Sequence, residues 1–142
     1  MVKLHADEPE HEEIRRLRVM IVCCLVRVEV PAALWRKHRI GELGIDDAAT
    51  LIAEFESDYF GAPDGRPRFL VLGLPSHVLD EAARLVAAHG LRAYDGLQMA
   101  AGKMARDAEP SCQGFACFDE DLRRAAAAEG FSLVPSNRRV RA

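Results

Sequence analysis

The apolar positions near the N-terminal end of the chain predict a strand that passes directly into a helix. Residues 19–30, VMIVCCLVRVEV, are rich in β-branched residues, which favour a buried strand. The continuation PAALWRKHR favours a helix, and Pro31 is tolerated only near a helix start. We therefore expect the strand to end near Cys24 or Leu25 and a helix to follow, although the pattern alone does not fix the junction.

In the rest of the chain, segments whose apolar residues follow the helical period of 3.6 residues alternate with short apolar runs. Strands that alternate with helices are typical of an α/β protein with a parallel sheet. No internal repeat or second domain is visible, so one domain over residues 1–142 is expected. The predicted elements are a charged helix within 3–18, helices at 47–60, 77–90, within 89–106 and at 122–130, strands at 68–74, from 114 and at 131–135, and a basic tail at 136–142.

The stretch HGLRAYDGLQMAAGKMAR, residues 89–106, places one carboxylate on an apolar helical surface. That carboxylate is Asp95, and an acid in such surroundings is costly unless it is hydrogen-bonded, paired or bound to a cation. The apolar positions follow the 3.6-residue period of a largely buried helix: Leu91, Tyr94, Leu97, Met99, Ala100, Ala101 and Met104.

Other acids follow predicted strands. Asp119 ends the strand that begins at residue 114, Asp121 comes two residues later, and Glu29 follows the first strand. In open α/β sheets, ligands bind beyond the carboxyl ends of the strands. Carboxylates that converge there would suit a hard divalent cation, Mg²⁺ or Mn²⁺. Each acid also has a plain structural interpretation: Glu29 as a solvated helix residue, Asp95 as an acid favoured by a helix N-terminus, and Asp119 or Asp121 as a helix cap.

Composition limits the class of protein. The 142 residues, 49% hydrophobic and 29% charged, are those of an ordinary globular domain. Nothing approaches the roughly 18 apolar residues of a membrane span, and the N-terminus does not read as a secretory signal, so a cytoplasmic location is expected. The formal net charge of −3 argues against a protein that coats nucleic acid, but a nuclease with an acidic site remains compatible with it. The cysteines lack zinc-site spacing and are expected to be reduced and buried: Cys23, Cys24, Cys112 and Cys117.

Three motifs resemble a known family. They are RVEV at 27–30, HGLRAYDGLQMAA at 89–101 and ACFDEDLRRAAAAEGF at 116–131, and KLHADEPEH at 3–11 matches as well. With these motifs the chain resembles the PIN-domain ribonucleases, specifically the VapC-type toxins of bacterial toxin–antitoxin pairs, over nearly its whole length.

This resemblance implies a Mg²⁺- or Mn²⁺-dependent endoribonuclease that cleaves RNA phosphodiester bonds. It further implies a homodimer and a small antitoxin whose tail enters the acidic site. By position, Glu29, Asp95 and Asp119 match the catalytic metal-site acids, and Asp121 is an auxiliary metal candidate. Arg92 would lie near the site with a role in substrate binding.

The chain also departs from the family pattern. The family begins with a strand that carries a principal metal-binding Asp, and this strand is normally the centre of the parallel sheet; no counterpart precedes residues 3–11 here. Either the cellular protein starts upstream, or the domain is truncated and compensates by local rearrangement or strand exchange. The alternative function is then a catalytically impaired PIN-like domain that binds a partner or RNA. A receiver-like domain ranks below both. Gly96 replaces a common Ala, which lowers helix propensity by about 1 kcal/mol.

Overall fold

The chain forms two compact units of mixed α/β structure. The computed structural model describes residues 20–61, 63, 65 and 67–136. The first unit is Met1–Val71 and the second is Leu72–Ala142. The charged helix expected within 3–18 and the basic tail expected after Ser136 lie outside the described residues.

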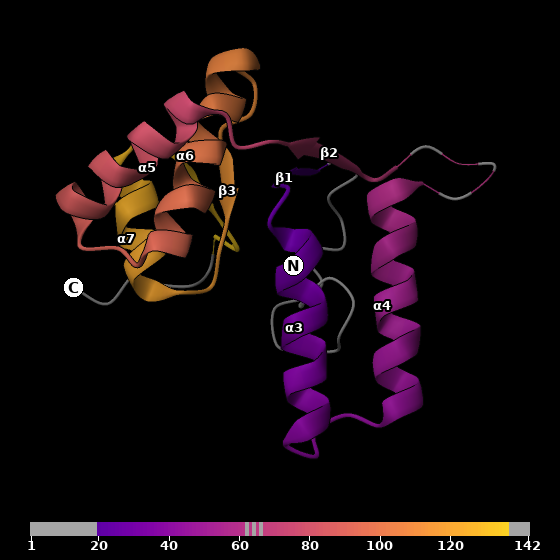
Figure 1. Ribbon diagram of the computed structural model, residues 1–142. Coiled ribbons are helices and arrows are strands. Elements are labelled where there is room, and N and C mark those ends of the chain that lie inside the picture. Colours follow the sequence, from indigo (N-terminus) through magenta and orange to yellow (C-terminus); the bar gives the residue numbers. More distant parts are fainter. Residues whose placement is uncertain (1–19, 62, 64, 66, 137–142) are drawn as a thin grey trace. The chain divides into compact units, whose positions relative to one another are not determined.

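In its described residues, the first unit holds two helices and two short strands. Helices α3 and α4 lie side by side (Figure 1). Strands β1 and β2 form a two-stranded sheet, and the Met20 N–H donates to the carbonyl of Arg68 at 3.3 Å. In chain order the elements are β1 (Met20–Cys23), α3 (Val26–Arg39), α4 (Ile45–Phe60) and β2 (Phe69–Leu72).

The junction between β1 and α3 confirms the expected break in the apolar run. The strand ends at Cys23, and the helix begins at Val26 after Leu25 as its N-cap. The buried side of α3 carries Val26, Val30 and Leu34, which recur at the four-residue interval of one helix face. Glu29 falls in the first turn of this helix.

The described part of the second unit holds three helices, labelled in Figure 1, and a parallel strand pair. Strands β3 and β4 run parallel, with Phe115 opposite Leu133. The expected parallel pairing is thus present, but the strands of the described residues form two separate two-stranded sheets. The elements are α5 (Ser76–His89), α6 (Ala93–Ala108), β3 (Gly114–Ala116), α7 (Glu120–Ala128) and β4 (Ser132–Val134).

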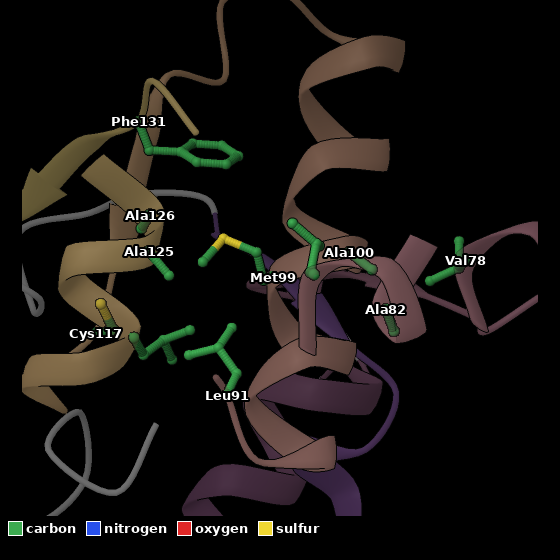
Figure 2. Packing of buried hydrophobic residues seen from close by; sticks show 11 residues of the cluster. Val78, Ala82, Leu91, Met99, Ala100, Cys117, Ala125, Ala126 and Phe131 are labelled. Carbon is green, nitrogen blue, oxygen red and sulfur yellow. The ribbon is translucent and has the colours of Figure 1, made fainter. Parts of the chain in front are cut away.

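The core of the second unit explains why α6 is so apolar. Met99 and Ala100 of α6 are fully buried in a cluster that draws on α5, α6 and α7 (Figure 2). Helix α5 ends at Gly90, as expected, because its φ of 66° is a left-handed conformation that favours glycine. The core residues of the cluster are Val78, Ala82, Leu85, Leu91, Met99, Ala100, Cys117, Leu122, Ala125, Ala126 and Phe131.

A glycine sets the spacing between α5 and α6. A Cβ atom added to Gly96 would lie 2.5 Å from Cγ2 of Val86 and 3.2 Å from the carbonyl oxygen of Ala82. The two helices therefore approach each other where Gly96 has no side chain. Gly96 lowers the helix propensity of α6, but it allows α6 to pack closely against α5.

All four cysteines are free, as expected. Cys23 and Cys117 are buried, but Cys24 and Cys112 are half-buried, so the expectation of burial is wrong for these two. Burial raises the pKa of the Cys23 thiol, so this side chain behaves as a small hydrophobe. Within the described ranges, no helix combines the length and the apolar character needed to cross a bilayer.

Candidate metal centre

Asp95 lies in the first turn of α6, directly after the turn that follows α5. Arg92 is the N-cap residue of the helix, with no side-chain capping hydrogen bond, and the helix begins at Ala93. The carboxylate is only 14% exposed. A negative charge is favoured near a helix N-terminus, which offsets part of the cost of this burial.

Asp119 lies at the corresponding start of α7, three residues after β3 ends. Its Oδ1 accepts a hydrogen bond from the Leu122 N–H at 3.0 Å, so Asp119 is the N-cap of the helix. The capping role that the sequence left open is therefore present. The second oxygen, Oδ2, takes no part in the cap, and the side chain is 41% exposed.

One guanidinium joins these two carboxylates. Nε of Arg92 donates to Oδ2 of Asp95 at 2.8 Å, and Nη2 of Arg92 donates to Oδ2 of Asp119 at 3.1 Å. The hydrogen bond with Asp95, followed by the charges of Asp95 and Asp119, raises the pKa of Arg92. Arg92, Asp95 and Asp119 thus meet at one place, from two helix starts that are distant in sequence.

Asp121 and Glu29 hold different positions. Asp121 pairs with Arg124 and is 67% exposed, and its charge makes a smaller contribution to the raised pKa of Arg92. It therefore lies at the edge of the acidic pair. Glu29 is half-buried in the first turn of α3 and belongs to the other compact unit.

A second arginine holds the segment that leads into Asp119. Arg123 is 1% exposed, and it donates to the carbonyls of Cys117 and Pro135, both at 2.9 Å. These bonds tie the end of β3 to the end of β4 just before the N-cap of α7. No motif in the sequence indicated a role for Arg123. The available signal was its place three residues before Ala126, on the buried side of the Ala-rich helix.

Another charged network joins α5, α6 and the end of α7. Lys103 Nζ contacts Glu81 at 2.9 Å and also pairs with Glu129, which in turn contacts His89 Nε2 at 2.8 Å. Hydrogen bonds from Arg84 and then Lys103 lower the pKa of Glu81 to about 2. Each carboxylate in this network has a cationic partner, so the network ties the helices together.

The chemistry of the Asp95–Asp119 pair fits a divalent cation. Two carboxylates already share one positive group, and carboxylate oxygens are the ligands that Mg²⁺ and Mn²⁺ prefer. Mg²⁺ is commonly held by one or two carboxylates and keeps several waters. Among the residues that the structure describes, no group of three or more His, Cys, Asp or Glu side chains could hold a metal ion. A cation held at this pair would have two carboxylates from the chain as ligands, so a metal ion here stays a prediction from the motifs.

A scan of the chain against models of protein families gives no match, and a search among curated proteins gives none either. The resemblance to the PIN-domain ribonucleases therefore rests on the motifs of the sequence.

Proposed function

We propose that this chain is a metal-dependent endoribonuclease of the VapC toxin type. One observation carries the proposal: two carboxylates from separate helix starts, Asp95 and Asp119, converge on a single cationic group. Both acids were expected at a metal site from the motifs that contain them. Mg²⁺ or Mn²⁺ is the proposed cofactor.

In this proposal, Asp95 and Asp119 bind the cation. A divalent cation held there supplies Lewis-acid stabilisation of charge at a phosphodiester and lowers the pKa of water. The low exposure of Asp95 limits competition from bulk water, and the Asp119 cap fixes the direction of that carboxylate. Arg92 is exposed enough to reach an RNA phosphate, and Asp121 is an auxiliary acid at the rim. The motif RVEV also suggests Glu29 as a metal-site acid, but Glu29 belongs to the other compact unit, so this role is proposed from the sequence resemblance alone.

The wider biology of the proposal follows from the sequence resemblance. The proposed partners are an RNA substrate, a second copy of the chain and an antitoxin that neutralises the acidic site, in the cytoplasm. Among the described residues, β1 pairs with β2 and β3 pairs with β4 in separate sheets, so the PIN-like sheet stays a prediction from the motifs.

A binding protein without catalysis is the second candidate. It is favoured by the number of acids at the site, because Asp95 and Asp119 meet there without a third described acid and both are satisfied by Arg92. Such a protein would retain the interaction surfaces of the toxin without metal-dependent cleavage. The two candidates differ in whether the acidic pair binds a divalent cation.

Cleavage of a fluorescent single-stranded RNA with added Mn²⁺ tests the proposal. The unmodified chain should cleave the RNA, and Asp95→Asn should abolish cleavage because it removes one metal-binding charge. Asp107→Asn is the matched control, since it makes the same change at an exposed position of the same helix. Equal cleavage by the Asp95 variant and the unmodified chain would reject the catalytic role of Asp95.

A further inference from the structure

Arg92 bridges Asp95 and Asp119, the two carboxylates proposed as metal ligands. Its two donors go to different carboxylates: Nε to Asp95 and Nη2 to Asp119. Both contacts end on the Oδ2 atoms. The guanidinium therefore neutralises the acidic pair from within the chain.

We propose that Arg92 is an internal counter-ion that competes with the divalent cation for Asp95 and Asp119. This inference rests on the proposed function, because it concerns the same acidic pair. In the metal-free protein the guanidinium holds the two carboxylates together. Metal binding displaces it, so Arg92 lowers the apparent metal affinity of the site.

The identity of the side chain decides how the counter-ion is released. Arginine stays protonated at every physiological pH, so a change of pH does not free the carboxylates. Only another cation can take its place. The planar guanidinium also presents separate N–H donors to two carboxylates, whereas a lysine ammonium acts as a single compact charge. Arg92→Lys should therefore compete less well than Arg92.

The exposure of Arg92 makes this displacement feasible. Its side chain is 76% exposed, and ion pairs at such positions are weak because water solvates the released charge. A divalent ion would therefore have only weak ion pairs to displace. The backbone of Arg92 is fixed as the N-cap of α6, so the released guanidinium stays beside the site, where an RNA phosphate is a suitable bidentate ligand.

The test is the dissociation constant for Mn²⁺, measured by titration calorimetry on the 142-residue chain. Arg92→Ala should bind Mn²⁺ about tenfold more tightly than the unmodified chain, the size expected for two exposed ion pairs that are lost together. Arg92→Lys should lie between them. Arg84→Ala is the control for net charge, because Arg84 is exposed and pairs with Glu81 instead; its Mn²⁺ affinity should be unchanged.

The outcomes separate the inference from the proposed function. Equal or weaker Mn²⁺ binding by Arg92→Ala, when the unmodified chain binds Mn²⁺, overturns the counter-ion role and leaves the metal site standing. An equal gain in Arg84→Ala overturns it as well, because the effect would then come from net charge. No Mn²⁺ binding by any of these proteins overturns the metal site and the inference together. Circular dichroism checks that each variant is folded.

Discussion

The guanidinium of Arg92 contacts the carboxylate of Asp119 at 3.1 Å, across 27 positions of the sequence. The contact exists because α6 and α7 begin on the same side of the second unit. Helix α6 begins after the turn that follows α5, and helix α7 begins after β3. Asp95, three residues after Arg92, completes the group. Arg92, Asp95 and Asp119 therefore form one candidate site.

Asp119 is the N-cap of α7 and a proposed metal ligand, and substitutions can separate these two roles. Asp119→Ala removes the helix cap and the charge, so the free energy of unfolding should fall by about 1 kcal/mol. Asp119→Asn keeps a capping oxygen and should change stability by only a few tenths of a kcal/mol. Urea unfolding measures both values.

Mn²⁺ binding by the same two variants completes the separation. Both variants should lose it, because neither retains the carboxylate charge at this position. Retained Mn²⁺ affinity in Asp119→Asn would mean that Asp119 is only a helix cap.

Local patterns in the sequence were enough to predict most elements. The β-branched run, the helix-favouring segment after it and Gly90 located the β1–α3 junction and the end of α5 correctly. The helix predicted at 77–90 begins one residue earlier, at Ser76, with Pro75 as its N-cap. Such one-residue errors are ordinary, because helix ends depend on tertiary contacts as well as on local preference.

The candidate site was predictable only in part. The helix-cap interpretation of Asp119 is confirmed, but the strand expected to end at this residue ends at Ala116. Its metal-site role stays a prediction. The exact bridge through Arg92 depends on how α6 and α7 pack, which no local pattern encodes. The burial of Arg123 and the network around Lys103 depend in the same way on contacts between distant segments.

Gly96→Ala should destabilise the protein although alanine is the better helix former. The new methyl group would meet Val86 at 2.5 Å, and overpacking of this kind costs about 1–3 kcal/mol, against a propensity gain of about 1 kcal/mol. The melting temperature should therefore fall. Gly73→Ala, where an added Cβ meets nothing within 4 Å, is the control and should have no such effect. An increased melting temperature in Gly96→Ala would contradict the close packing of α5 and α6.

Arg123→Met should lower the free energy of unfolding by about 2–4 kcal/mol. The variant fills the space but leaves the carbonyls of Cys117 and Pro135 without their buried donor. Arg124→Met makes the same change at the next position, where the side chain is 58% exposed, and should cost at most about 0.5 kcal/mol. Similar losses in the two variants, measured by urea unfolding, would be inconsistent with the buried role of Arg123.

Glu81 should contribute to stability in a defined range of pH. Its pKa in the folded protein is about 2, below the ordinary value of 4.5, because Arg84 and Lys103 stabilise the charged form. The stabilisation is therefore complete above pH 4.5 and is lost as the pH falls toward 2.

Glu81→Gln tests this range of pH. At neutral pH the variant should be less stable than the unmodified chain by about 1 kcal/mol, since the pairs are partly exposed. The difference should shrink to near zero by pH 2 when urea unfolding is repeated across this range. A stability difference that stays constant between neutral pH and pH 2 would show that it does not come from the ion pairs of Glu81 with Arg84 and Lys103.

The most direct test of the central claim is whether the Asp95–Asp119 pair binds a divalent cation. Titration calorimetry with Mn²⁺ should give a saturable heat for the unmodified chain, no such heat for Asp95→Asn, and an unchanged heat for the exposed control Asp107→Asn. Loss of the heat in Glu29→Gln as well would place Glu29 in the same site. A heat that persists unchanged in Asp95→Asn, or no heat for the unmodified chain, would contradict the proposed metal centre.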